Sequence, residues 1–523
     1  MIYLLPYLAA ALLLVAALVA FACDGRKEQL AAKVCEALAA LTILVAISSI
    51  VSVVLIGAGT SPAFGYAGFG FSVRIDALSV VMMSLVSFVG WVVLRYVRNY
   101  LSGEARQGTF LGWMCLTIGA VLLLVSSGNL VQLMIAWSCT SLFFHKLLLF
   151  YPERFQARRA ARKEFLTARS SDYALLIAVI LLGWSFGTGD VAQILSTITL
   201  GENSSLVLWA TGFIAVAAIL KSAQFPSHGW LTEVMETPTP VSALLHAGLI
   251  NAGGFLLIRF ADVMLLNSGV MAALVGIGGF TALFGCVVML TQPAVKTSLA
   301  WSTISQMGFM IFQCGLALFP IALLHIVAHS LYKAHAFLSA GDAVENVTQI
   351  SRPGPIAPPS LKAVSSAFLV ALGIYMVIGV ITGLQEKSPQ AIALGGILIF
   401  GVTYLLAQGF ADAAPKALTK KIAIYASLSS ISYFILHSGA ELLMAGLLPA
   451  PPTPGPLEWT LITLSLISFG SVAFAQSMFP LWVGHPAARD IRVHLSNGLY
   501  AKALFDRFVR AWSPKNTFRK LEE

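Results

Sequence analysis

The residues best suited to chemistry lie in one stretch, residues 221–260, where a lysine and a histidine occur within otherwise apolar sequence. Lys221 ends one apolar run, a proline-rich polar stretch follows, and His246 lies near the middle of the next run. An ionisable group at membrane depth is costly and usually marks an ion or proton path. Helices broken at that depth are tolerated only against protein or a water-filled cavity. We therefore predict a proton path through both residues. A lysine whose ammonium group reaches the membrane interface would explain Lys221 alone, but not the prolines and the histidine that follow it.

A second set of protonatable residues lies in the apolar run 319–340. His325, His329 and Lys333 are spaced at i, i+4 and i+8, which places them along one face of a helix. A row of such groups across a membrane is typical of a proton relay. Two other interpretations remain open, a buried hydrogen-bonded cluster and a metal site formed by the two histidines. No third ligand follows nearby and the lysine would repel a cation, so we favour the relay, with His335 on another face as a structural residue.

Several other titratable residues have more than one interpretation. Glu233 and Glu236 are the acidic residues nearest to Lys221 in the linker before the second run. Because a neighbouring carboxylate favours the charged form of a lysine, either is a candidate partner for Lys221. His145 and Lys146 fit an interfacial helix end as well as they fit a path.

Two further sites are predicted to be structural. His437 and Glu441 are four residues apart near a helix end, and we expect hydrogen bonding between helices there. Residues 64–79 alternate aromatic residues and glycines, which predicts a short β-hairpin. Asp76 lies within this stretch, at a position where it can cap the following helix.

The composition of the chain indicates that membrane-spanning helices position these residues. Of its 523 residues, 58% are hydrophobic and only 11% are charged, whereas soluble domains carry about 25% charged residues. Apolar segments of about 20 residues, enough to span a bilayer, occur about fifteen times. We predict an all-α polytopic membrane protein with a broken helix near Lys221. The six cysteines are scattered without a Cys-x-x-Cys pair, so no metal, redox cluster or other cofactor is expected in this chain.

The distribution of basic residues predicts the orientation. With the N-terminus outside the cell, nearly all loop lysines and arginines fall on the cytoplasmic side, as does the C-terminus. The net charge of +9 then reflects membrane topology, not nucleic-acid binding. We expect a multi-pass protein of the bacterial cell inner (cytoplasmic) membrane. Its densest basic cluster would bind anionic lipid headgroups or dock an acidic partner surface; it consists of Arg158, Arg159, Arg162 and Lys163.

The apolar segments suggest two repeats of five helices. An odd number of helices per repeat requires that the repeats be inverted in the membrane, as in many transporters. The predicted divisions are an N-terminal three-helix segment with the hairpin (1–109), a first repeat (110–260), a second repeat (261–412), two C-terminal helices (413–480) and a basic cytoplasmic tail (481–523). Within the tail, residues 494–514 are amphipathic and fit an interfacial helix or a docking segment.

Three motifs in combination resemble the antiporter-like subunits of NADH:quinone oxidoreductase (subunit L) and of Mrp cation/proton antiporters. They are PTPVSALLHAG (238–248), LAWSTISQMGFM (299–310), and the spacing of His325, His329 and Lys333 followed by AHAFLSAGD. The resemblance implies that Lys221 corresponds to the broken-helix lysine and His246 to the protonatable residue of helix eight. It likewise implies that the row from His325 to Lys333 is the central relay.

The chain departs from this family pattern at two positions. The family has Trp-Glu in helix five, where the glutamate pairs with the broken-helix lysine, but this chain has Trp137 and Ser138. The corresponding lysine of the second half is also absent from the apolar segment 364–384. Both changes point away from a conventional respiratory role.

The stretches 141–172, 235–254 and 496–508 resemble DabB, the membrane subunit family of the DAB inorganic-carbon accumulation complex. This resemblance implies a partner, DabA, a large cytoplasmic zinc protein with a site like that of β-carbonic anhydrases. The implied function is proton flow that drives CO2 hydration in the partner, so that bicarbonate accumulates. The chain would not be an enzyme on its own, and the zinc would lie in the partner.

Two alternative functions remain. A cation/proton antiporter or complex-I-type proton-translocating subunit would have many small membrane partners and sodium- or quinone-linked activity. A scaffolding anchor would carry polar residues without a role, but the broken helix and the row of three residues argue against it.

Overall fold

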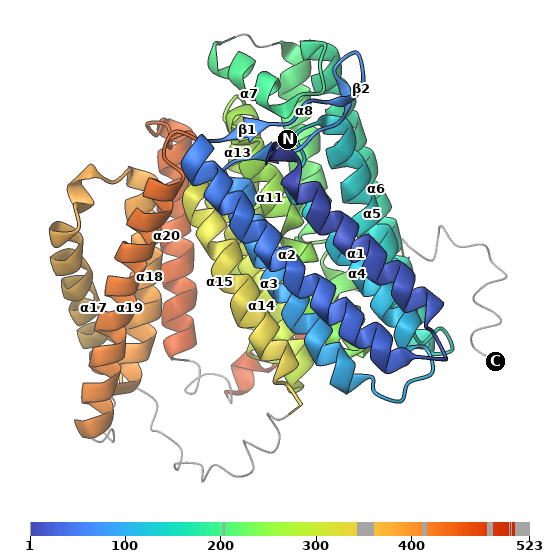
Figure 1. Ribbon diagram of the computed structural model, residues 1–523. Coiled ribbons are helices and arrows are strands. Elements are labelled where there is room, and N and C mark those ends of the chain that lie inside the picture. The colour runs from blue at the N-terminus through green and yellow to red at the C-terminus, as the bar shows by residue number, and fades with distance from the viewer. Residues whose placement is uncertain are drawn as a thin grey trace.

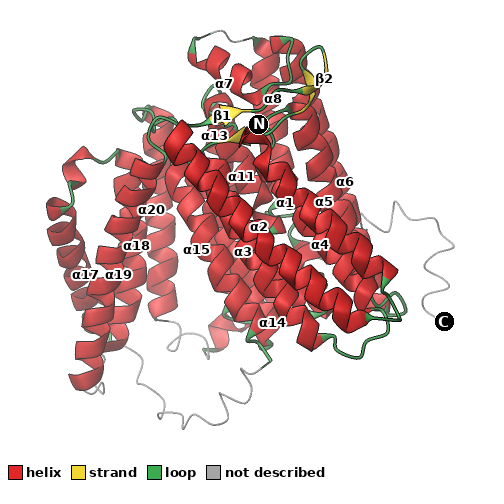
Figure 2. Cartoon of the chain, viewed as in Figure 1, coloured by secondary structure: helices red, strands yellow, loops and turns green. Residues whose placement is uncertain are grey.

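The computed structural model of the chain describes residues 2–201, 204–341, 360–409, 416–478 and 485–507, except 502 and 504. This part of the chain is almost entirely helical, with four short strands near one end of the molecule (Figure 2). Within it, twelve helices are long and apolar enough to cross a membrane. The helices run alongside one another in two groups, a larger bundle and a smaller group beside it (Figure 1).

The larger bundle contains helices α1 to α15, and the smaller group contains α17 to α20. The larger bundle comprises α1 (Leu5–Ala22), α2 (Glu28–Ile56), α3 (Ala77–Tyr100), α4 (Gln107–Val125), α5 (Leu130–Leu148), α6 (Phe155–Phe186), α7 (Val191–Thr199), α8 (Ser205–Lys221), α9 (Gly229–Glu233), α10 (Thr239–Ala247), α11 (Ala252–Arg259), α12 (Ala261–Met264), α13 (Ser268–Met289), α14 (Val295–Gly315) and α15 (Phe319–Leu338). The smaller group comprises α17 (Leu361–Ile381), α18 (Pro389–Gly409), α19 (Lys416–Leu443) and α20 (Pro456–Ser477), and α22 (Arg489–Ser496) follows it.

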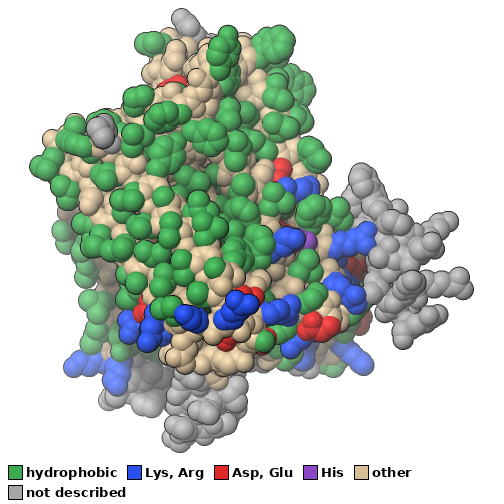
Figure 3. Space-filling model, turned by 45° about the vertical axis from the view of Figure 1, so that its right-hand side comes forward, with side chains coloured by type: hydrophobic (Ala, Val, Ile, Leu, Met, Phe, Trp, Pro, Cys, Tyr) green, Lys and Arg blue, Asp and Glu red, His purple; other side chains and the backbone are tan. Residues whose placement is uncertain are grey.

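The surface of the molecule has the character expected in a membrane. Hydrophobic side chains cover most of the lateral face in Figure 3, and basic side chains gather towards its lower end. An apolar core runs through the larger bundle, and a separate, smaller core joins α17, α18 and α19. Apolar side chains on the outside and inside of the same helices are what a polytopic membrane protein requires.

The strands form at the end of the bundle that contains the N-terminus, as the hairpin prediction requires (Figure 1). β2 (Phe64–Tyr66) pairs antiparallel with β3 (Phe69–Phe71), and β1 (Gly59–Thr60) pairs antiparallel with β4 (Arg74–Ile75). The predicted cap is also confirmed, because the Asp76 carboxylate accepts a hydrogen bond from the backbone N–H of Ser79 at 2.9 Å.

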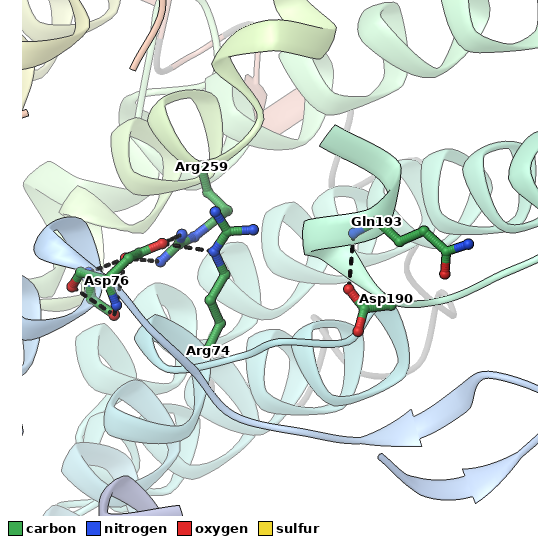
Figure 4. A network of polar contacts seen from close by, with 6 residues as sticks. Arg74, Asp76, Asp190, Gln193 and Arg259 are labelled. Carbon is green, nitrogen blue, oxygen red and sulfur yellow. Dashed lines mark hydrogen bonds and ion pairs between the residues drawn. The ribbon is translucent and has the colours of Figure 1, made fainter. Parts of the chain in front are cut away.

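Asp76 has a second role in joining this end to the middle of the chain. Its carboxylate is fully buried and lies 2.5 Å from Arg259 at the end of α11 and 2.7 Å from Arg74 (Figure 4). Burial alone would raise the pKa of Asp76, but the charge and hydrogen bonds of Arg259, together with Arg74, outweigh it and hold the pKa well below its usual range. The pair therefore fixes α11, and the chain before it, against α3.

Replacing Asp76 with alanine should destabilise the fold strongly, because it leaves Arg259 buried without its carboxylate. Breaking a buried ion pair in this way costs about 3–5 kcal/mol. Asp190 provides a matched control: it caps α7 by accepting from the Gln193 N–H at 3.0 Å (Figure 4), and loss of such a cap costs about 1 kcal/mol. Thermal unfolding in detergent should therefore show a much larger drop in melting temperature for Asp76→Ala than for Asp190→Ala. Equal drops would contradict the role given to the Arg259 pair.

Helices α13 and α14 approach each other closely through glycines. A Cβ at Gly278 would lie 2.5 Å from the backbone nitrogen of Phe312, and one at Gly308 would lie 2.4 Å from that of Ala282. Small residues that allow two backbones to touch are a common device for packing membrane helices. This contact fixes α14, which carries Thr303 and Gln313, next to the protonatable residues described below.

The predicted helix break is present, and a second interruption follows it in the next helix. α8 ends at Lys221, and the chain does not become helical again until α9 begins at Gly229. The next helix is interrupted in turn, because α10 ends at Ala247 and α11 begins at Ala252. His246 therefore lies one residue before the end of α10, so both predicted chemical residues flank interruptions of helices.

Candidate functional site

Lys221 is held inside the bundle at the end of α8. It is only 8% exposed, and its Nζ atom donates a hydrogen bond to the Thr140 hydroxyl of α5 at 3.1 Å. The same ammonium group lies 4.9 Å from the ring centroid of Trp137, also on α5. An aromatic face and a hydroxyl stabilise a charge only in part, so the protonated form needs a carboxylate.

Helix α6 supplies that carboxylate. The charges of Asp172 and Glu164, two turns apart on α6, both act on Lys221. Glu164 and Lys221 line a cavity of about 20 Å³, enough space for one water molecule. Asp172 lies beside Ser138, the position at which the family resemblance places a glutamate, and it is paired with Arg169 at 2.9 Å.

The sequence analysis did not identify either acidic residue of α6. Both lie in a stretch whose many arginines drew attention to lipid or partner binding instead. The available signal was the spacing: Glu164 and Asp172 are eight residues apart, which places them on the same side of a helix. That spacing alone does not say that this side faces Lys221.

The two acidic candidates named from the sequence are placed differently. Glu233 at the end of α9 is ion-paired with Lys163 at 2.5 Å and with Arg159 at 3.3 Å. The side chain of Glu236 lies outside the described residues. Glu233 thus joins α9 to α6. The acidic neighbours of Lys221 are Asp172 and Glu164, and not Glu233 as expected.

The predicted docking cluster is only partly on the surface. The Lys163 side chain is 2% exposed and is ion-paired with both Glu233 and Asp506. Asp506, in the tail, also lies 2.5 Å from Arg159. Lys163 therefore cannot present its charge to a partner, which corrects the prediction for this residue. Arg158 is exposed.

His246 lies fully buried between three helices. Its Nδ1 atom is 2.9 Å from the Thr303 hydroxyl of α14, and its ring stacks on Phe337 of α15 with centroids 4.4 Å apart. Its Nε2 atom is buried and has no hydrogen-bond partner among the described residues. Leu245, its neighbour in sequence, lines the small cavity at Lys221.

The row on α15 continues from His246. His329 and Lys333 are buried, and the charge of His246 acts on His329. The rings of His329 and His325 have centroids 6.0 Å apart. Lys333 Nζ donates to the Leu299 carbonyl at 3.1 Å. The four residues thus form one row from α10 along α15, in which His246, His329 and Lys333 are buried and His325 is half-buried.

Unpaired ring nitrogens are the chemical signature of this row. The Nε2 atoms of His325 and His329, like that of His246, are buried and lack a hydrogen-bond partner in the described part of the chain. His325 Nδ1 lies 2.9 Å from the Gln313 amide oxygen. Because buried polar atoms are normally satisfied by protein or ordered water, these nitrogens are suited to water-mediated proton exchange. No group of three or more His, Cys, Asp or Glu residues within the described ranges is arranged to hold a metal ion.

Two regions of the chain match known protein families. Residues 127–352 match the family described as "NADH:quinone oxidoreductase/Mrp antiporter, TM". Residues 63–111 match "NADH-Ubiquinone oxidoreductase (complex I), chain 5 N-terminus". The row and the helix break both fall within the first of these matches.

Individual relatives are similar over most of the chain. The chain is 36% identical over 467 residues to the "Probable inorganic carbon transporter subunit DabB2" of Halothiobacillus neapolitanus, covering 88% of this chain and 84% of that protein. It is 38% identical over 377 residues to the corresponding DabB subunit of Hydrogenovibrio crunogenus, covering 72% of each. The NADH-ubiquinone oxidoreductase chain 5 of Chondrus crispus is 33% identical over 339 residues, which cover 62% of this chain and 50% of that protein.

Solved structures show the shared fold. A chain of the Mrp complex from Dietzia sp. DQ12-45-1b superposes with a TM-score of 0.62 at 22% identity, covering 99% of this chain and 61% of that chain. A chain of respiratory complex I from Thermus thermophilus gives a TM-score of 0.56 at 19% identity, covering 96% of this chain and all of that chain. The described helices therefore share the fold of these two chains.

Proposed function

Because this chain belongs to the DabB family of inorganic carbon transporter subunits, we propose that it is the proton-conducting half of a two-component complex that accumulates CO2 as bicarbonate. The observation that carries the proposal is a set of protonatable residues inside the bundle. Lys221 is buried at the helix break. His246, His329 and Lys333 are buried, and His325 is half-buried beside His329. Family membership supports inorganic carbon as the substrate class, and the buried row supports protons as the ion.

The proposed path begins at the helix break. Protons reach Lys221 through the small cavity that it shares with Glu164 and pass to His246 at the interruption of α10. From there they move along α15 through Lys333, His329 and His325. Histidine suits this role because one ring nitrogen can accept a proton while the other releases one.

Asp172 serves as the carboxylate that pairs with the broken-helix lysine, a role that the resemblance assigns to a glutamate of helix five. The family places that carboxylate at the position of Ser138 on α5. Here the carboxylate comes from α6, beside Ser138, and its charge acts on Lys221. The acid–lysine pair is thus retained with the acid on the adjacent helix.

We propose the orientation that the basic residues favour. The end with the strands and the N-terminus lies outside, and the end at which lysines and arginines gather is cytoplasmic (Figure 3). The C-terminus is then cytoplasmic, in the inner membrane of a bacterium. Within this topology, about fifteen membrane-spanning segments include two inverted five-helix repeats, residues 110–260 and 261–412.

The hydration of CO2 belongs to the proposed partner, a DabA-like large zinc protein on the cytoplasmic face. This chain supplies ion movement and carries out no catalysis itself. The exposed Arg158 is suited to bind an acidic surface of that partner. Its neighbours Arg159 and Lys163 hold Glu233 of α9, so a partner bound at this surface is linked to the segment that follows Lys221.

Isolation of the tagged chain in mild detergent tests the partner. We expect one large protein to co-purify, with about one zinc ion per copy as in enzymes of this type. A series of small hydrophobic subunits, or flavin and iron–sulfur proteins, would instead indicate an antiporter or respiratory complex. That second function is favoured by the 33% identity to chain 5 of NADH-ubiquinone oxidoreductase, and such a result would contradict the carbon proposal.

A further inference from the structure

A large cavity opens where the row on α15 ends. It has a volume of about 610 Å³ and lies between α13–α15 of the larger bundle and α18–α20 of the smaller group. His325 lines it, and the Nε2 atom of this histidine is among the buried, unpartnered nitrogens of the described chain. Most of its wall is apolar, with a few amide and hydroxyl groups: Gln306, Gln313, Tyr404, Tyr433 and Gln476.

On the far side of this cavity, a chain of protonatable side chains leads towards solvent. Tyr433 of α19 lines the cavity, and its hydroxyl lies 3.3 Å from Nδ1 of His437. His437 Nε2 lies 3.0 Å from Glu441 Oε1, and the other carboxylate oxygen of Glu441 is ion-paired with Lys387. The His437 side chain is 3% exposed and that of Glu441 is 41% exposed. The chain therefore leads from the cavity wall to an exposed carboxylate within about two turns of one helix.

Helix α17 of the smaller group offers little for a proton to use. Within the apolar segment of α17, which follows Lys362, no lysine, histidine, aspartate or glutamate occurs. A proton at His325 accordingly needs another route to solvent. The loop between α19 and α20 lies at the same end of the molecule as the strands (Figure 1), so Glu441, two residues before the end of α19, lies towards that end.

We propose that this cavity and the sequence Tyr433, His437, Glu441 form the second opening of the proton path, an inference that rests on the proposed function. Water in the cavity connects His325 to Tyr433. The Tyr433 hydroxyl donates to His437 Nδ1, and the hydrogen on Nε2 passes to Glu441. When Tyr433 gives its proton to Nδ1, it takes one from cavity water, and protonated His325 returns one to that water, so the water, the imidazole and the phenol all end neutral. Glu441 then releases the proton that it received to solvent. Lys387 keeps Glu441 ionised between transfers and ready to accept the next proton.

Passive proton flux in liposomes containing the complete purified complex tests this path, with a potassium diffusion potential as the driving force. Tyr433→Phe and His437→Gln each remove one transfer group. Tyr425→Phe on the exposed face of the same helix is the matched control. We expect each of the first two to reduce flux at least about tenfold, less than the ~10²–10⁴-fold that a positioned proton-transfer group contributes. Tyr425→Phe should behave as wild type.

A second variant blocks the route without touching any titratable group. Gly401 of α18 lines the cavity, and a Cβ there would meet no atom within 4 Å. Gly401→Phe therefore fills the space without a backbone clash, and it should also reduce flux at least about tenfold. Flux equal to wild type in either His437→Gln or Gly401→Phe would overturn this inference.

The same assay separates this inference from the proposed function. If wild-type complex conducts protons, Lys221→Ala does not, and His437→Gln conducts normally, then only the second opening is wrong. If wild-type complex does not conduct at all, the proposed function itself fails. Co-purification of the large partner with each variant confirms that it has folded and assembled.

Discussion

Cells that carry Lys221→Ala are expected to lose growth at ambient CO2 and to recover it at elevated CO2. The variant removes the only lysine at the helix break, and the small cavity then contains Glu164 without the ammonium group. A positioned proton-transfer group contributes about 10²–10⁴-fold to a rate, so we expect bicarbonate accumulation, measured with labelled inorganic carbon, to fall at least about tenfold.

Lys146 provides the matched control for this prediction. It lies near the end of α5 and is exposed, so Lys146→Ala should leave accumulation unchanged. The amount of subunit in the membrane and the co-purified partner should be equal in all three strains, because the apolar core that packs the bundle is left intact. Normal accumulation by Lys221→Ala would contradict the proposed mechanism.

Asp172→Asn is expected to have the second largest effect, and its rescue gives a sharper test. The substitution keeps the size of the side chain but removes the carboxylate whose charge acts on Lys221. Loss of one member of a buried charge pair costs about 3–5 kcal/mol. We expect accumulation to fall at least about tenfold, which corresponds to only about 1.4 kcal/mol in a rate-limiting barrier.

Returning the carboxylate to α5 should restore function. Ser138 lies beside Asp172, so Ser138→Glu combined with Asp172→Asn places an acid at the position that the family resemblance favours. We expect the double variant to recover most of the accumulation lost in Asp172→Asn. Glu233→Gln should instead weaken the contact with Lys163 and leave the acid near Lys221 in place. A double variant as inactive as Asp172→Asn, with Glu233→Gln more harmful than either, would contradict the assignment of Asp172.

The elements that could be predicted from the sequence are those set by local pattern. The apolar segments predicted membrane-spanning helices, of which the described chain has twelve where about fifteen were expected. The proline-rich stretch predicted the break after Lys221, and the spacing of His325, His329 and Lys333 predicted their place on one helix, α15. The cap at Asp76 and the adjacent hairpin are also local, because an N-cap bonds to a backbone N–H only three residues away.

The contacts that could not be predicted join residues far apart in the chain. Glu233 was expected near Lys221, only 12 residues away, but it pairs with Lys163 at a separation of 70 residues. Asp506 reaches Arg159 across 347 residues. A single sequence gives the charge of each residue but not which helix it faces, so the acidic partner of Lys221 was assigned by proximity along the chain.

The buried part of the basic cluster shows the same limit. Four basic residues within six positions predict an exposed charged surface, and this holds for Arg158. Lys163 instead turns inward, because the carboxylates of Glu233 and Asp506 offset the cost of burying its ammonium group. Only the packing of α9 and the tail against α6 reveals that part of this cluster is structural.

The central claim is that proton movement through this chain drives the accumulation of bicarbonate. The most direct measurement uses liposomes that contain the purified complex, with bicarbonate formation from CO2 followed while a proton or a sodium gradient is imposed. We predict that bicarbonate formation rises with the proton gradient, stops when a protonophore removes it, and is absent in the Lys221→Ala complex. Formation that is the same with and without a proton gradient, or that follows a sodium gradient instead, would contradict the account.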